Sequence, residues 1–275
     1  MTLATIADVK NFWDSRPCNV KRSPAPVGSP QFFADTERNK YFVEPHIPDF
    51  AEFEKWGDKK VLEIGCGIGI DTLSFAWWGA KVTAIDLSEK SLEIARKRLE
   101  SVKLIADFRQ MNAEKLGLDG TLRDHIKYDL VYAFGSIHHS PNPDKIVNRA
   151  FWALKSGGTL KLMVYNKYSW KSLWVLLKYG HGKFWKFGEL IARYSEAQTG
   201  CPITHVYSRK ELRAMLERNG FHVRKMYVDH VFKLDIEEYK KYNYRVVWYF
   251  RWIPKSWFRA FERLAGWHLL CEATV

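Results

Sequence analysis

The pattern of apolar and polar positions divides the chain into a regular middle and less regular flanks. Between residues 59 and 165, short apolar runs typical of buried strands alternate with amphipathic segments that have helical spacing. The pattern predicts strands at 61–64, 81–86, 103–110, 128–134 and, after a turn at 156–158, 159–165, and helices at 71–78, 89–100 and 143–154. Strands and helices that alternate in this way form a parallel sheet covered by helices on both faces.

The flanks follow other patterns. Six prolines interrupt the first 50 residues, where short helices are expected around 9–14 and 34–43. After residue 165 an aromatic and basic stretch precedes a helix at 208–219, in which Ser208 and Glu211 fit a capping box and Gly220 ends the helix. A strand at 221–228, a second aromatic and basic stretch and an apolar strand at 267–273 follow.

The length of 275 residues fits one α/β domain with insertions rather than an array of modules. We expect an N-terminal lid over residues 1–50, a core over 51–165, a cap insertion over 166–207, a core helix and strand over 208–228, a second cap insertion over 229–265 and a last core strand over 266–275.

The composition excludes several classes of protein. With 47% hydrophobic and 27% charged residues the chain can build a core and is not disordered. It has no uncharged apolar run of about 18 residues, and its N-terminus lacks the pattern of a secretory signal. The four cysteines lie far apart without a C-x-x-C pair, so we expect no disulfide framework, no metal site and a cytoplasmic location.

The net charge of +12 is localised. Residues 159–265 hold 21 of the 43 Lys and Arg but only 9 of the 31 Asp and Glu, so the rest of the chain is neutral. The same segment carries 23 of the 42 Phe, Tyr and Trp residues. This asymmetry predicts a neutral binding or catalytic core with a specialised second element.

A glycine-rich loop is the most informative motif. Gly65, Gly67 and Gly69 directly follow the predicted strand 61–64, where they allow the backbone to approach a ligand and turn into a helix. Glu63 lies in that strand, and Asp86 ends the next one, where a carboxylate can accept both hydroxyls of a ribose. A nicotinamide cofactor is the competing interpretation, but it normally requires G-x-G-x-x-G.

The segments Glu63-Ile-Gly-Cys-Gly-Ile-Gly69 and Ala84-Ile-Asp-Leu-Ser88 resemble the first two motifs of the class I S-adenosylmethionine (SAM)-dependent methyltransferases. The resemblance covers about residues 55–165 and extends to methyltransferases of the type 11 and type 12 kind. It implies a Rossmann-like, seven-stranded sheet that is mostly parallel, with an antiparallel last strand and helices on both faces.

The resemblance also implies the cofactor contacts. The glycine loop would pass under the methionine portion of SAM, Asp86 would hold the ribose, and the turn at Asn112 would contact adenine. The family more often has Asp at the position of Asn112, but an amide oxygen can still accept from the adenine amino group. The expected cofactor-binding residues are Glu63, Gly65, Cys66, Gly67, Gly69, Asp86, Leu87, Asn112, Ala113, Phe134, Arg16 and Tyr41.

The candidate chemistry lies after the fourth and fifth strands of the repeat. His139, or else His138, could deprotonate or orient the acceptor, although either histidine could equally cap a turn. Tyr165 and Asn166 could bind the acceptor, or Tyr165 could form a wall. In the lid, Arg16 could pair with the methionine carboxylate or form a solvated salt bridge, and Tyr41 could line the cofactor pocket.

The two aromatic and basic stretches are interpreted as a cap over the substrate. A small molecule or peptide, RNA, or a membrane surface could bind such a cap, or it could be a packed helical cap with solvated cations. The chain contains no recognisable RNA-binding module, which disfavours RNA. The sequence thus predicts a monomeric or homodimeric SAM-dependent methyltransferase that acts on an O or N atom of a metabolite or natural product, including a ribosomally made peptide. An RNA methyltransferase and a non-catalytic SAM-binding scaffold are the alternatives.

Overall fold

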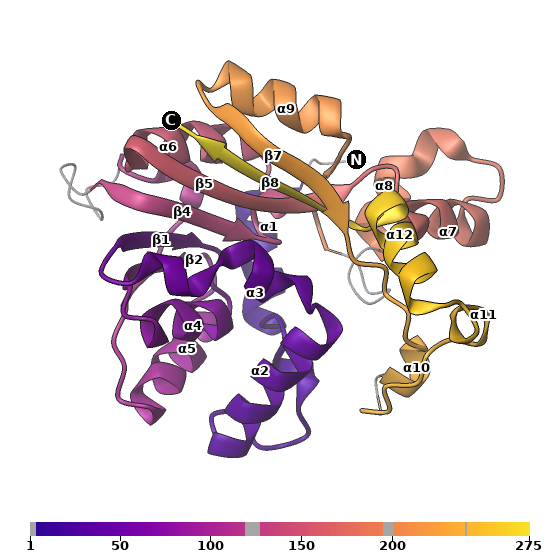
Figure 1. The fold of residues 1–275 in the computed structure, drawn as a ribbon, viewed down its shortest axis with the longest axis horizontal. Coiled ribbons are helices and arrows are strands. Elements are labelled where there is room, and N and C mark those ends of the chain that lie inside the picture. The colour runs from indigo at the N-terminus through magenta and orange to yellow at the C-terminus, as the bar shows by residue number, and fades with distance from the viewer. Residues whose placement is uncertain (1–3, 119–126, 195–200, 240) are drawn as a thin grey trace.

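A computed structural model describes residues 4–118, 127–194, 201–239 and 241–275. Parts of the predicted lid and caps, at 1–3, 195–200 and 240, lie outside these residues. The described strands form one sheet in the order β3-β2-β1-β4-β5-β8-β7, and the short β6 pairs with β5 (Figure 1). Their bounds are β1 Lys60–Ile64, β2 Lys81–Asp86, β3 Asp107–Gln110, β4 Tyr128–Phe134, β5 Leu154–Asn166, β6 Val206–Tyr207, β7 His222–Asp229 and β8 His268–Thr274.

The pairing confirms the predicted fold class. β1 to β6 pair in parallel, whereas β8 lies antiparallel between β5 and β7. The sheet order reverses between β1 and β4, so a crevice is expected there at the carboxyl ends of the strands.

Helices cover both faces of the sheet. Side chains of α3, α4 and α5 pack on one face, and those of α6 and α9 pack on the other (Figure 1). The helices and 3-10 turns are α1 Ile6–Ser15, η1 Val20–Arg22, α2 Pro30–Val43, α3 His46–Ala51, η2 Phe53–Trp56, α4 Ile70–Trp77, α5 Glu89–Ser101, η3 Ala113–Lys115, η4 Ile137–His139, α6 Pro143–Ala153, α7 Trp170–Tyr179, η5 Phe184–Lys186, α8 Phe187–Tyr194, α9 Arg209–Arg218, α10 Ile236–Tyr239, α11 Trp248–Arg251 and α12 Lys255–Ala265.

Two buried cations fix the N-terminal segment to the core. Arg98 of α5 donates to the carbonyl oxygens of Ile68 (2.9 Å) and Phe33 (3.1 Å), which links the glycine loop to α2. Lys161 of β5 donates to the carbonyl oxygen of Phe50 (2.7 Å), which fixes α3 against the sheet. The chain that precedes the sheet is therefore packed on it.

Several predicted boundaries were wrong. The strand predicted at 103–110 begins only at Asp107, because α5 continues to Ser101 and a turn follows. The predicted turn at 156–158 lies inside β5, where Gly157 (φ +73°) forms an irregularity in the pairing with β4. The end of the segment expected to be a cap insertion over 166–207 contributes β6 to the sheet. The last two differences depend on strand pairing, which local sequence does not encode.

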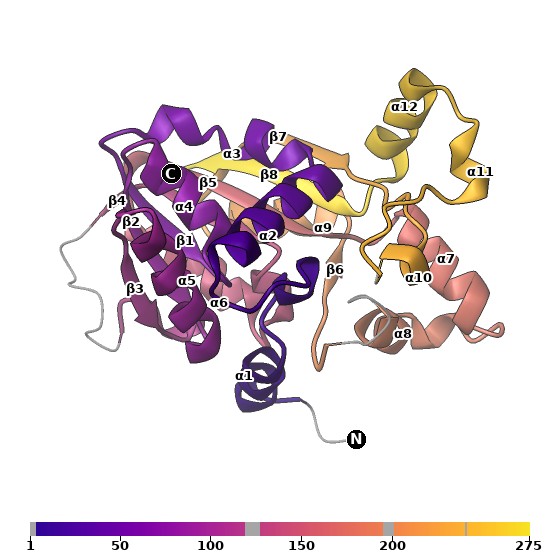
Figure 2. The same cartoon turned by 90° about the horizontal axis from the view of Figure 1, so that it is seen from below.

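The two insertions lie together at one end of the molecule. Both views place α7, α8 and α10 to α12 beyond the end of β5 and β7 (Figures 1 and 2). Trp170 of α7 contacts Phe250 and Phe261 of the second insertion, with ring centroids 6.2 and 5.9 Å apart. The capping box of Ser208 and Glu211 on α9, predicted from sequence, is confirmed.

Candidate active site

A cavity of about 250 Å³ opens at the carboxyl ends of the parallel strands. The last residues of β1, β2 and β4, namely Ile64, Asp86 and Phe134, line it together with Met163 and Tyr165 of β5. The N-terminal segment forms the opposite wall. Its lining residues are Ile6, Val9, Trp13, Cys18, Asn19, Arg22, Lys40 and Glu44.

The glycine loop borders this cavity in a conformation that requires glycine. A Cβ atom on Gly65 (φ +76°) would lie 2.3 Å from the Cβ of Ser136, so the loop and the β4 turn are in close contact. Gly67 (φ +54°) lines the cavity, and a Cβ atom there would meet no atom within 4 Å. The loop thus leaves open space above its backbone, as a bound ligand needs.

Asp86 is held at the cavity by two backbone amides. Its carboxylate accepts hydrogen bonds from the N–H groups of Gly67 and Ser88, both at 2.8 Å. Burial raises the pKa of Asp86 above its ordinary value, although these two N–H groups favour the charged form. Asn112 also lines the cavity, and its side-chain oxygen accepts from the N–H of Glu114 (3.0 Å).

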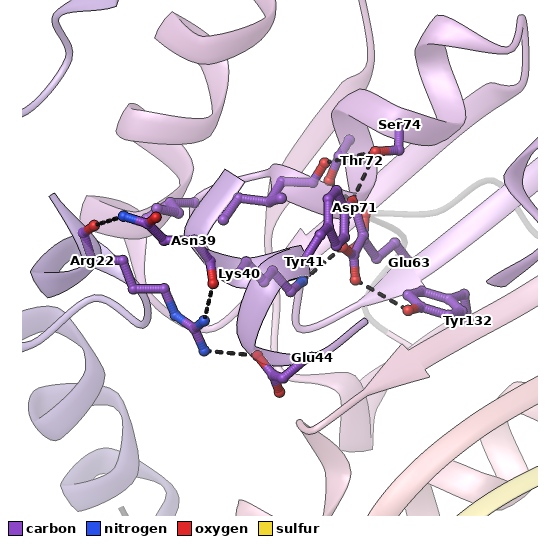
Figure 3. A network of polar contacts seen from close by, with 12 residues as sticks. Arg22, Asn39, Lys40, Tyr41, Glu44, Glu63, Asp71, Thr72, Ser74 and Tyr132 are labelled. Atoms are coloured by element: carbon purple, nitrogen blue, oxygen red, sulfur yellow. Dashed lines mark hydrogen bonds and ion pairs between the residues drawn. The ribbon is translucent and has the colours of Figure 1, made fainter. Parts of the chain in front are cut away.

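A buried polar network joins the loop to α2 (Figure 3). Asp71 of α4 accepts from Lys40 (2.7 Å), Tyr41 (3.0 Å) and Tyr132 (3.0 Å). Burial, and next the negative charge of Asp71, raise the pKa of Glu63 to about 8. The network brings Lys40 to the cavity wall but directs the Tyr41 hydroxyl to Asp71 and Ser74.

A second polar group lies on the other side of the cavity. Arg22 donates to Glu44 (2.7 Å) and to the carbonyl oxygen of Asn39 (3.0 Å). Burial opposes the charged form of Glu44, but Arg22 outweighs it and keeps the pKa of Glu44 below its ordinary value. Glu44 and His268 both line the cavity, and their side chains lie 3.8 Å apart.

Two more buried histidines, His46 and His230, pack behind His268 outside the cavity lining. His46 and His268 share a hydrogen bond of 2.9 Å, and the His230 ring lies 4.6 Å from that of His268. Burial lowers the pKa of all three, that of His230 to about 3. Within the described ranges, no cluster of His, Cys, Asp and Glu side chains has the arrangement of a metal site.

The two histidines after β4 differ in position. His139 lines the cavity, and its Nδ1 lies 2.9 Å from the carbonyl oxygen of Ile203. Because a carbonyl only accepts, Nδ1 carries the proton, and the basic lone pair is on Nε2. His138 is fully buried between His139 and Tyr165, with neither ring nitrogen bonded, and burial lowers its pKa far below the ordinary value.

The structure brings most of the predicted site residues to the one cavity. These are Glu63, Gly65, Cys66, Gly67, Asp86, Leu87, Asn112, Ala113, Phe134, His139 and Tyr165. Gly69 supports the loop from behind, where a Cβ would lie 2.8 Å from the Cβ of Ala95. The individual roles of these residues remain predictions.

Besides Gly69, four predicted site residues do not line the cavity. Arg16 lies over the ring of Phe12, Tyr41 bonds to Asp71, and His138 is enclosed by rings. The Asn166 amide donates to the carbonyl oxygens of Gly266 (2.9 Å) and Tyr168 (3.2 Å), so it joins two backbone segments.

Other residues at the cavity were not predicted. Trp13, Arg22, Lys40, Glu44 and His268 all line it. For the first four the only sequence signal was the position of the N-terminal segment before the glycine loop, which indicated a lid but not its inward-facing residues. His268 lies in the last strand, and no sequence signal placed it at the cavity.

The cavity also fits SAM in chemical terms. It offers open space above Gly67, a buried carboxylate at Asp86 for ribose hydroxyls and the Asn112 turn for adenine. Lys40 and Arg22 also line the cavity, each paired with a carboxylate of this chain, Asp71 and Glu44.

Comparison with known proteins agrees with this chemistry. A family described as a methyltransferase domain matches residues 36–226. Ubiquinone biosynthesis O-methyltransferase from Actinobacillus pleuropneumoniae serotype 5b is 36% identical over 109 residues, or 40% of this chain, and the match spans about half of that relative, 47%. The enzyme of the same name from Bordetella bronchiseptica is 32% identical over 171 residues, 54% of this chain and 69% of that relative.

A solved structure shares the fold across the chain. Magnesium protoporphyrin IX methyltransferase from Synechocystis PCC 6803, with bound S-adenosylhomocysteine (SAH), superposes with a TM-score of 0.60 at 17% identity over 97% of each chain. The matched sequence family, the sheet order and the glycine loop agree with one another. The chain belongs to the class I SAM-dependent methyltransferases, the family in which SAM is the methyl donor.

Proposed function

We propose that the protein transfers a methyl group from SAM to a hydroxyl oxygen of a small metabolite or natural product. The observation that carries this proposal is the placement of His139 and the glycine loop with Asp86 on one cavity. The similarity to ubiquinone biosynthesis O-methyltransferases supports an oxygen acceptor. Phe134, Met163 and Tyr165 provide apolar walls that suit a ring-containing acceptor.

His139 is proposed as the general base. The carbonyl oxygen of Ile203 holds its Nδ1 proton, so Nε2 is the ring atom that can take the hydroxyl proton of an acceptor. SAM supplies an electrophilic methyl group when it is bound. Asp86 and the loop amides would bind and orient the cofactor, and Trp13 of α1 would help to exclude water.

The cavity also bears on the other acceptors. The cavity of about 250 Å³ also has to hold SAM, so its volume does not separate a small acceptor from the side chain of a peptide. No described residue of 166–205 or 229–265 lines the cavity, so the substrate-covering role of the two insertions gains no support from this arrangement.

Isotope-labelled SAM tests the proposal. The protein is incubated with phenolic small molecules, with peptides and with total RNA, and incorporation is measured in each fraction. We expect label in the small-molecule fraction and a rate that falls by about 10²- to 10⁴-fold in His139→Gln, as for loss of a general base. The matched control is His205→Gln, which removes an exposed histidine outside the cavity wall.

Calorimetry with SAH separates catalysis from binding. His139→Gln should bind SAH as the unchanged protein does, whereas Asp86→Ala should lose about 10-fold or more in affinity because it loses charge-assisted hydrogen bonds. Label found only in RNA would contradict the proposed acceptor. Tight SAH binding with no transfer to any fraction would favour the non-catalytic scaffold instead.

A further inference from the structure

We propose that the end of the molecule formed by α7, η5, α8, α11 and α12 docks on an anionic membrane surface. We call this end the cap surface, and define it by its large exposed apolar residues together with the surrounding Lys and Arg. The apolar members are Leu173, Leu177, Trp185, Trp248, Trp252, Trp257 and Leu264. The inference concerns a surface away from the cavity, so it does not rest on the proposed reaction.

The tryptophans of the cap surface are unusually exposed. Trp252 is 85% exposed, Trp248 79%, Trp185 78% and Trp257 73%. Single exposed apolar residues are common on protein surfaces, but four such indoles at one end are not. Tryptophan is enriched where one side of a ring is apolar and the other is wet, as at a lipid headgroup layer.

The apolar face of helix α12 is only partly covered by the rest of the protein. Phe258 is buried and Phe261 half-buried against Phe250 and Trp170, so they face the molecule. At 100° per residue, Trp257 and Leu264 lie on an adjoining stripe, and both remain exposed. The opposite arc carries Lys255, Arg259 and Arg263. A helix of this kind can lie in the plane of an interface with its uncovered apolar stripe inserted.

Helix α7 repeats this arrangement in the first insertion. Ser172 and Val175 are buried, whereas Leu173 and Leu177, one turn apart, are 48% and 72% exposed. Lys178 is exposed on the same helix. Because Trp170 packs on Phe250 and Phe261, α7 is held against the second insertion, and α7 and α12 lie at the same end of the molecule (Figure 2).

The positive charge of the cap surface favours a membrane with anionic lipids. Residues 170–194 and 248–265 contain nine Lys and Arg and two Asp and Glu. Both acids are near cations, since Glu189 lies 3.9 Å from Lys186 and Glu262 lies 3.2 Å from Arg259. Each Lys or Arg close to an anionic leaflet contributes about 1 kcal/mol to the free energy of membrane binding. Proteins bind single-stranded nucleic acid through stacking aromatic rings and cations. The exposed leucines among the indoles therefore favour lipid as the partner.

The test is flotation of the whole protein with vesicles. We expect binding to phosphatidylcholine vesicles that contain phosphatidylglycerol, and at least about 10-fold weaker binding to pure phosphatidylcholine vesicles. The variant Trp248→Ala/Trp252→Ala/Trp257→Ala should lose about 10-fold or more of the partition into anionic vesicles. Lys255→Glu/Arg263→Glu should lose a similar factor, and this loss should disappear at high salt.

A matched control uses exposed tryptophans at another place. Trp77 is the last residue of α4 and Trp78 follows it, before β2 begins; the two are 69% and 54% exposed and lie outside the cap surface. Trp77→Ala/Trp78→Ala should bind vesicles as the unchanged protein does. Equal loss in this control, or no vesicle binding with RNA binding or self-association instead, would overturn the inference. Melting temperature and SAH affinity of each variant report whether it is folded.

Discussion

A side chain at Gly67 would occupy the space that the loop keeps open. Gly67 and Gly79 both have positive φ, +54° and +84°, and a Cβ on either would meet no atom within 4 Å. Gly67→Ala and Gly79→Ala should therefore each lose about 1–2 kcal/mol of unfolding free energy through backbone strain. Only Gly67 lines the cavity, so we expect only Gly67→Ala to lose SAH affinity, by about 10-fold or more in calorimetry. Equal affinities in the two variants would place the cofactor elsewhere.

Arg98 is a buried cation whose hydrogen bonds hold α2 over the glycine loop. Arg98→Met removes the donors for the carbonyl oxygens of Ile68 and Phe33 and for the Thr36 hydroxyl, which stay buried. We expect a loss of about 3 kcal/mol in urea unfolding, as for broken buried charge networks. Arg96→Met, which removes the half-exposed partner of Glu89, should change stability by about 0.5 kcal/mol or less. Similar losses in both variants would show that Arg98 has no special role.

Helix α1 contributes one wall of the cavity but little of the core. Trp13 lines the cavity, whereas Val9 is the buried residue of the helix. Trp13→Ala should raise the KM for the acceptor several-fold while the melting temperature changes by only about 2 °C. Phe12→Ala, which removes the neighbouring ring outside the cavity lining, is the matched control and should leave KM unchanged. A loss of stability without a change in KM would assign α1 a structural role only.

The elements that could be predicted are those whose signal is local. The strand before Gly65, the strand that ends at Asp86 and the helix capped by Ser88 all carry apolar periodicity and capping residues in adjacent positions. Glu44 and His268 meet at the cavity from residues 224 positions apart, so no local pattern could indicate them. For Asn166 the local signal was misleading. Its position at a strand end predicted a place at the site, but its side-chain amide donates to two backbone carbonyls instead.

At the scale of the whole molecule, the surplus positive charge and most of the cavity lie in different parts of the chain. The neutral part of the chain holds the glycine loop, Asp86 and His139, whereas the surplus of basic residues lies between 159 and 265. Within the helices that the structure describes, none is both long and apolar enough to cross a bilayer. The surplus positive charge therefore bears on which partner the surface binds, not on the methyl transfer itself. Mutation of the cap surface should leave the turnover of a small dissolved acceptor unchanged.

The buried histidines make folding stability depend on pH. His46 on α3, His230 after β7 and His268 on β8 pack together, and Glu44, Arg22, Asp229 and Arg259 surround them. Burial lowers the pKa of all three in the folded state, that of His230 to about 3. As the pH falls through about 6.5, the unfolded chain takes up protons at these positions before the folded chain does. The free energy of unfolding should therefore fall as the pH falls from about 6.5.

Each of these histidines can add up to about 1.4 kcal/mol per pH unit to the slope, because one bound proton separates the two states. Two protonated rings at His46 and His268 would also point N–H groups at each other across 2.9 Å, so their hydrogen bond would be lost. Urea unfolding between pH 7.5 and 5.5 measures the slope. His230→Gln should make it shallower by about 1 kcal/mol per pH unit, whereas His222→Gln, which removes an exposed histidine, should leave it unchanged. If His230→Gln left the slope unchanged, the ring would take up its proton over the same pH range in the folded and the unfolded chain, and Glu44 and Asp229 would then offset the effect of burial.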